Sequence, residues 1–109
     1  MDLKELTDLV VKSADERQIL AHSTPDAQAV KTVEEAQELL DAARMGKEFG
    51  WPTLGQAEYI DAVGDILVTL IIGCRMRDLD MVECLASAYD QIKDRKGHLS
   101  PEGIFVKDA

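Results

Sequence analysis

Residues 32–43 read TVEEAQELLDAA, and residues 59–73 read YIDAVGDILVTLIIG. In both stretches apolar residues recur at spacings of three and four, which is typical of helices that bury one face. Acidic side chains follow the same helical spacing, and they are Glu34, Glu35 and Glu38 in the first helix and Glu58, Asp61 and Asp65 in the second. We therefore expect these two helices to face each other through the sides that carry the acidic residues, and this pair decides the fold.

The rest of the chain predicts two further helices, which gives an all-α, four-helix bundle-like fold in a single domain, residues 1–109. Thr24 before Pro25 and Asp80 before an apolar run are predicted N-caps. Gly46 is a predicted C-terminal stop, followed by a loop over residues 46–55. The predicted helices cover about residues 3–17, 25–45, 56–77 and 81–96, and residues 104–106 form a short extended patch.

Composition limits the possible functions. The 109 residues carry a net charge of −9, which disfavours a nucleic-acid binder with a broad basic face and a protein held on an anionic membrane. The longest apolar run, about residues 66–72, is far too short to span a bilayer. Two cysteines without a CxxC motif argue against a disulfide framework, and a reduced, cytoplasmic setting is expected.

The position of the carboxylates suggests metal-dependent phosphate chemistry. The second acidic set runs directly into the apolar run, so we expect Asp65 to be partly buried. Crowded, desolvated carboxylates need a compensating positive charge. An all-oxygen ligand set without histidine favours Mg²⁺ or Mn²⁺ over zinc, with one or two ions that bridge substrate phosphates. The alternative is a solvated glutamate-rich surface, with Asp65 as an ordinary hydrogen-bond acceptor.

Four segments of the chain resemble those of a known protein family. The segments TVEEAQELLDAA and YIDAVGDILVTLIIG, followed by AYDQIKDRKG (88–97) and EGIFVKDA (102–109), are similar to MazG-like nucleotide pyrophosphohydrolases, especially short phage- or integron-type members. These belong to the all-α NTP pyrophosphohydrolase superfamily, and the resemblance covers roughly residues 27–107. It implies Mg²⁺-dependent hydrolysis of (deoxy)nucleoside triphosphates to monophosphate and pyrophosphate, in a house-cleaning role.

The family pattern is EExxE followed by ExxD. Residues 34–38 match the first part, and residues 58–61 are a literal ExxD. The apolar run after Asp65 also resembles the sequence that follows the last aspartate of the family pattern. If the chain is aligned by this run, Ala62 takes the position of the family's glutamate. Because Asp61 and Asp65 are one turn apart on one face, we assign the catalytic ligands to Glu35, Glu38, Asp61 and Asp65, with Glu34 and Glu58 as supporting metal ligands.

Several other residues are candidates for substrate binding. Lys31 lies one turn before Glu35, where it contacts a phosphate or pairs with a glutamate. Trp51 on the loop stacks on a base or plugs the helix ends. Leu20 and His22 line a base pocket, or His22 is a plain surface residue. A basic cluster consists of Lys93, Arg95 and Lys96. The resemblance implies that this cluster binds phosphate; the alternative is that its charge stabilises the C-terminus of a helix.

We expect a homodimer or a dimer-of-dimers tetramer, because four short helices leave apolar surface uncovered and because the resembled family builds its pocket between subunits. Residues 104–106 are expected to pack on a neighbouring subunit. The alternative function is a non-catalytic helical module for nucleotide binding, oligomerisation or regulation. Within the enzyme class, phosphoribosyl-ATP is the runner-up substrate.

Overall fold

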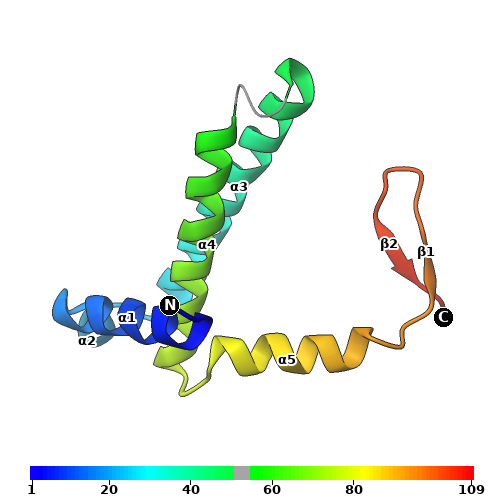
Figure 1. Ribbon diagram of the computed structural model, residues 1–109. Helices are drawn as coiled ribbons and strands as arrows, with labels where there is room; N and C mark the ends of the chain where they lie inside the picture. The colour runs from blue at the N-terminus through cyan, green and yellow to red at the C-terminus, as the bar shows by residue number, and fades with distance from the viewer. Residues whose placement is uncertain (51–54) are drawn as a thin grey trace.

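The computed structural model describes residues 1–50 and 55–109, and these are mostly helical (Figure 1). A long helical pair, α3 and α4, forms the centre, with α1 and α2 on one side of its lower end and α5 leaving on the other. A small antiparallel hairpin, β1–β2, ends the chain. The bounds are α1 Leu3–Glu16, α2 Ile19–His22, α3 Pro25–Phe49, α4 Gln56–Met76, α5 Met81–Ile92, β1 Gly97–Leu99 and β2 Phe105–Lys107.

Side-chain caps set three of the helix starts. The Thr24 hydroxyl accepts from the Ala27 N–H at 3.0 Å, with Pro25 at the first helical position, and the Asp80 carboxylate accepts from the Val82 N–H at 2.8 Å. Asp2 caps α1 in the same way, at 2.8 Å from the Glu5 N–H. Each cap satisfies a backbone donor that has no partner within its helix. The predicted caps Thr24 and Asp80 are thus confirmed.

The prediction that Gly46 ends the helix is wrong. Gly46 is buried inside α3, which continues to Phe49 and ends at Gly50, whose φ is +92°. The chain returns at Gly55, which packs closely against this part of α3: a Cβ on Gly55 would lie 2.6 Å from the Ala42 carbonyl oxygen. Gly55 also has φ +81°, so glycine suits this position for both space and backbone conformation.

The α3–α4 contact uses small and polar residues. Ala42 and Ala62 are buried, and the Thr32 and Thr69 hydroxyls lie 2.7 Å apart between the helices. The sequence predicts an apolar face of α3 made by Val30, Val33, Ala36 and Leu40, but this face is largely exposed, and Val33 is 70% accessible. The neighbouring stripe, which contains Glu35 and Ala42, meets α4 instead.

The pair consequently has two different flanks. At about 100° per residue, the flank that carries apolar side chains is made by Val33, Ala36, Leu40, Val63, Leu67 and Leu70, and we call it the apolar flank. The opposite, acidic flank carries Lys31, Glu34, Glu38, Asp61, Asp65 and Val68.

Helix α5 and the hairpin form an arm, residues 81–107, that extends away from the α3–α4 pair (Figure 1). No residue of α5 is buried, so α5 does not pack into the four-helix bundle that was predicted, although the described chain is mostly helical. The fourth helix was expected to reach about residue 96 but ends at Ile92. The extended patch expected at residues 104–106 is present as β2, which pairs with a strand that was not predicted, as His98 faces Val106 in the ladder.

No helix in the described ranges 1–50 and 55–109 combines the length and apolar character that a membrane crossing requires.

Candidate functional site

Two hollows follow the acidic flank of the α3–α4 pair. The larger, about 1040 Å³, lies where the end of α1 and α2 meet the pair, and Lys31, Glu35 and Asp65 are among its lining residues. The smaller, about 260 Å³, includes Glu38, Glu58 and Asp61 in its lining. Five of the six predicted carboxylates therefore line hollows on the same flank.

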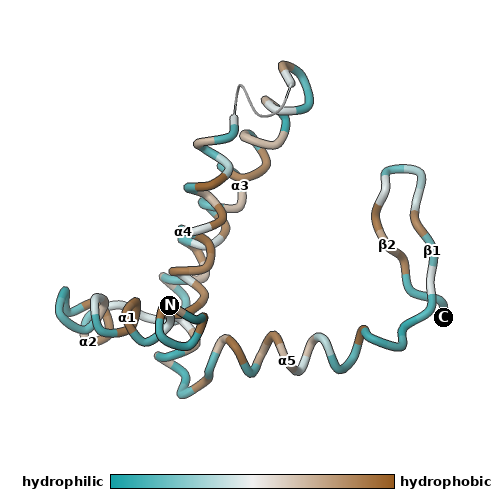
Figure 2. Tube along the Cα trace, viewed as in Figure 1, coloured by the Kyte–Doolittle hydropathy of each residue, from teal (hydrophilic) through white to brown (hydrophobic). Residues whose placement is uncertain are grey.

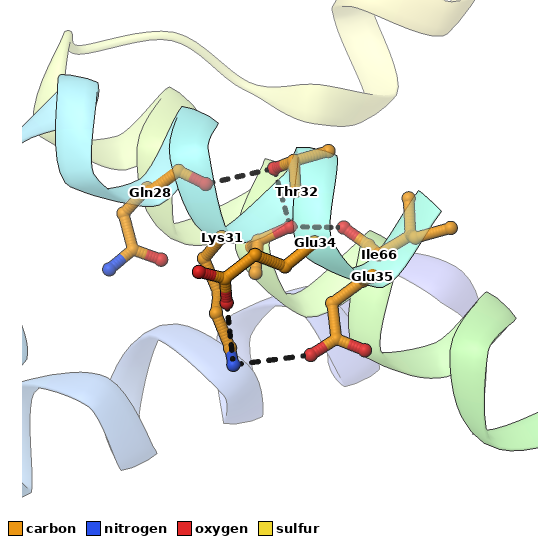
Figure 3. A network of polar contacts seen from close by, with 7 residues as sticks. Gln28, Lys31, Thr32, Glu34, Glu35 and Ile66 are labelled. Carbon is orange, nitrogen blue, oxygen red and sulfur yellow. Dashed lines mark hydrogen bonds and ion pairs between the residues drawn. The ribbon is translucent and has the colours of Figure 1, made fainter. Parts of the chain in front are cut away.

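Glu35 is the buried member of the set. Only 5% of its surface is accessible, because it lies on the stripe of α3 that meets α4. One carboxylate oxygen, Oε1, lies 3.5 Å from Lys31 Nζ, whereas Oε2 is buried and has no hydrogen-bond partner among the described residues. Figure 3 shows Lys31 reaching toward Glu34 and Glu35 beside the threonine contact. A buried, unsatisfied carboxylate oxygen is unfavourable and indicates a missing partner.

The other acids are exposed, including Asp65, for which partial burial was predicted. That prediction is wrong because Thr69, one turn further along α4, takes the central place against Thr32. Asp65 lies at the edge of the helix contact and borders the larger hollow. The burial expected at Asp65 occurs at Glu35 on the facing helix.

The acids interact electrostatically across the flank. A hydrogen bond to Glu35 that only the protonated Glu38 can donate, together with charge repulsion from Glu35, raises the pKa of Glu38 above its usual value. Asp65 adds a smaller contribution in the same direction, while Lys31 opposes it. The contacts with Glu34 and Glu35 raise the pKa of Lys31. The charges of Glu35, Asp65 and Lys31 thus all act on the pKa of Glu38, and Lys31 is the positive one among them.

The raised pKa of Glu38 leads to a prediction for the metal-free protein. A carboxyl whose pKa is higher in the folded state contributes stability at low pH and loses it as pH rises through that folded pKa. Glu38→Gln removes the charge, so it should be more stable than the wild type at pH 7. This advantage should shrink as pH falls toward 4.5, the ordinary value. Thermal melts from pH 4.5 to 8 with EDTA test this, and a difference that does not depend on pH would contradict it.

The predicted substrate-binding residues are not all brought together. Lys31 is at the site. Its Nζ lies 3.3 Å from a carboxylate oxygen of Glu34, which agrees with the second of its two predicted roles, pairing with a glutamate. Within one chain the basic cluster of Lys93, Arg95 and Lys96 lies at the distal end of α5, remote from the acids in Figure 1, and Lys93 pairs with Asp90 at 2.7 Å. Trp51 lies outside the described residues.

Sequence reasoning missed part of the larger hollow. Arg17, Ser23 and Gln28 line it together with His22, whereas Leu20 is not among the lining residues. The Gln28 side-chain amide donates to the Ser23 hydroxyl at 3.0 Å. A usable signal existed: Gln28 shares the helical stripe of Lys31 and Glu35, one turn before Lys31.

Within the described part of the chain, no three or more His, Cys, Asp or Glu side chains are grouped closely enough to hold a metal ion. The chain was also compared with protein-family models, curated proteins and solved structures, and none of these comparisons found a match.

Proposed function

We propose that the protein hydrolyses (deoxy)nucleoside triphosphates to the monophosphate and pyrophosphate, with Mg²⁺ as cofactor and a homo-oligomer as the working form. The observation that carries this proposal is the buried, unpartnered Oε2 of Glu35 in a wall that also bears Asp65 and Lys31. The resemblance of residues 27–107 to MazG-like pyrophosphohydrolases supports the reaction class.

The donor chemistry of the acidic flank fits Mg²⁺, which prefers carboxylate and water oxygens. Glu35, Glu38 and Asp65 interact through their charges already, and Glu58 and Asp61 border the adjoining hollow. Glu35, Glu38, Asp61 and Asp65 would hold the ion, with support from Glu34 and Glu58. When bound, Mg²⁺ supplies charge stabilisation at the phosphates and lowers the pKa of a coordinated water.

The chain's own residues orient the substrate. Lys31 is exposed, and its ammonium lies beside the buried Glu35, where it neutralises charge on the wall of the larger hollow. A carboxylate of the acidic flank that does not hold the ion would accept the proton of the attacking water. The hollow's volume of about 1040 Å³ is at the upper end of the range for small-molecule pockets, so a nucleotide has room in it.

The direct test measures pyrophosphate and monophosphate from a panel of canonical and modified dNTPs and NTPs, with Mg²⁺ and with EDTA. Phosphoribosyl-ATP belongs in the panel as the runner-up substrate. Equal amounts of the two products, formed only with Mg²⁺, are expected. Folded protein that releases no pyrophosphate from any nucleotide would overturn the proposal.

One observation favours a second function, a nucleotide-binding module without turnover: in a single chain, the basic cluster lies away from the acids that would meet the phosphates. Calorimetric titration with nucleotide and Mg²⁺ separates the two functions. Mg²⁺-dependent binding without pyrophosphate release identifies the module.

A further inference from the structure

The two cysteines of the chain lie on either side of the turn that joins α4 to α5. Cys74 is in the last turn of α4 and is half-buried, and Cys84 is in the first turn of α5 and is exposed. Neither cysteine lines one of the two hollows of the acidic flank. A role of this pair is therefore separate from the chemistry proposed for the carboxylates.

Backbone hydrogen bonds fix the end of α4 in a Schellman motif. The Leu79 N–H donates to the Cys74 carbonyl oxygen at 2.8 Å. The Asp78 N–H donates to the Arg75 carbonyl oxygen at 3.2 Å, and Asp78 has the left-handed backbone of this motif, with φ +56°. In such a motif the residue after the left-handed one commonly packs on the residue that accepts its N–H. The motif therefore draws the Cys74 side chain toward Leu79.

The start of α5 draws the second cysteine toward the same leucine. Asp80 caps this helix: its carboxylate accepts from the Val82 N–H at 2.8 Å, and its carbonyl oxygen accepts from the Cys84 N–H at 3.0 Å. The residue before an N-cap commonly packs on the fourth residue of the helix, and this contact fixes the angle at which the chain enters. These two residues are Leu79 and Cys84. One leucine is thus shared by both capping motifs, which brings the two cysteines together.

The two thiols also interact directly. Burial raises the pKa of the Cys74 thiol, and charge repulsion from Cys84 and a hydrogen bond with Cys84 raise this pKa further. A hydrogen bond between thiols requires the two sulfur atoms to be neighbours. The geometry of the turn and the thiol contact therefore agree that the sulfur atoms of Cys74 and Cys84 lie side by side.

We propose that Cys74 and Cys84 form a reversible disulfide that fastens the arm to α4, and that the oxidant is a small-molecule disulfide such as oxidised glutathione. The exposed Cys84 thiolate attacks one sulfur of the oxidant, whose S–S bond breaks and releases one thiolate. The Cys74 thiolate then attacks the Cys84 sulfur of this mixed disulfide and releases the second thiolate. The two cysteines lose two protons and two electrons, and the oxidant takes them up as two thiols.

The bond would change how firmly the arm is held. No residue of α5 is buried, so the direction of α5 depends on the turn more than on side-chain packing. Figure 1 shows the arm leaving the α3–α4 pair at this turn, and Figure 2 shows brown, apolar segments along α5, so the turn also decides where that apolar surface is presented. A disulfide across residues 74–84 removes conformations in which the arm swings away.

This pair also has the features of a redox-sensing site. Disulfides that form in reducing compartments are mostly transient and redox-sensing. Sensing cysteines are accessible and often have a second cysteine beside them, as Cys84 has Cys74. The inference does not depend on nucleotide hydrolysis, and its tests use no nucleotide.

The first experiment locates the bond. The reduced full chain is treated with oxidised glutathione, alkylated and digested with trypsin without reductant. Trypsin cuts after Arg75 and Arg77, so residues 48–75 and 78–93 separate unless a disulfide joins them. We expect joined peptides that a reductant separates, from a chain that runs at 12.0 kDa on a denaturing gel without reductant.

Cys84→Ser is the matched control, because this residue is exposed and the variant should fold but give no joined peptides. A wild-type chain that carries only glutathione adducts overturns the proposal. Joined peptides that come only from species of twice the mass also overturn it, because the bond would then link two chains.

The second experiment tests whether the fold holds the thiols together. Mixtures of reduced and oxidised glutathione give the ratio at which half of the pair is oxidised, for the native chain and in concentrated guanidinium chloride. The native chain should need at least about tenfold less oxidised glutathione, because the turn raises the effective concentration of one thiol at the other. A native chain that needs as much oxidant as the unfolded chain, or more, overturns the proposal.

Hydrogen exchange then tests the effect on the arm. Amide hydrogens in the first turn of α5, residues 81–84, should exchange more slowly in the oxidised chain than in the reduced chain, because the bond restrains local opening there. Equal exchange rates in a chain shown to carry the disulfide would overturn the claim that the bond fastens the arm.

Discussion

Asp65→Asn should release pyrophosphate from nucleoside triphosphates at least about 100-fold more slowly than the wild type in saturating Mg²⁺, the scale on which losses around metal ligands act. Asp65 borders the larger hollow together with Glu35 and Lys31, and its charge contributes to the raised pKa of Glu38. The amide keeps the shape of the side chain but removes the negative charge that Mg²⁺ requires. Initial rates over a range of Mg²⁺ concentrations measure the effect.

Because Asp65 is exposed, this substitution should leave the fold intact, so unchanged helical circular dichroism is part of the prediction. Glu48→Gln is the matched control: Glu48 is exposed near the end of α3, outside both hollows, and its variant should keep the wild-type rate. If Asp65→Asn and Glu48→Gln both keep the wild-type rate, the assignment of Asp65 to the site is wrong.

Local signals in the sequence predicted where four of the described helices begin, but they missed the short α2. Capping by Thr24 and Asp80 depends only on residues within one turn, so the starts of α3 and α5 could be predicted without the rest of the chain. Gly46 was misjudged because it has two possible roles, helix stop and close-packing residue. The approach of Gly55, nine positions away, decides between them, and single-sequence patterns do not contain that contact.

Periodicity predicted which acids share a side of each helix, but not which of them is buried. Both Glu35 and Asp65 lie near the helix contact, and the pairing of Thr32 with Thr69 decides that Glu35 is the one enclosed. The direction of the arm was beyond such reasoning for a similar reason. Three-residue strands are too short to show an alternating pattern, and the turn after α4 sets where α5 points.

Glu35→Gln should stabilise the metal-free protein while it removes its response to Mg²⁺. In the wild type, Glu35 is buried with one oxygen unpartnered, and it repels Glu38. The new amide is neutral and can donate to the Glu38 carboxylate, so repulsion becomes attraction. Relief of the unpartnered oxygen and of the repulsion outweighs the loss of the pair with the exposed Lys31. We expect a net gain of about 1 kcal/mol, which corresponds to roughly 4–8 °C in the melting temperature of a domain of this size.

The adjacent Glu34 provides a strict control for this prediction. Both carboxylates contact Lys31, at 3.3 Å from Glu34 and 3.5 Å from Glu35, but Glu34 is exposed. Exposed ion pairs contribute little, so Glu34→Gln should change the melting temperature with EDTA only slightly. Mg²⁺ should stabilise the wild type and, to a smaller extent, Glu34→Gln, whose residue only supports the ion, but it should not stabilise Glu35→Gln, which lacks the buried oxygen that would bind the ion. A Glu35→Gln protein that melts lower than the wild type in EDTA would show that the carboxylate is satisfied without metal, and the main support for a metal site would be lost.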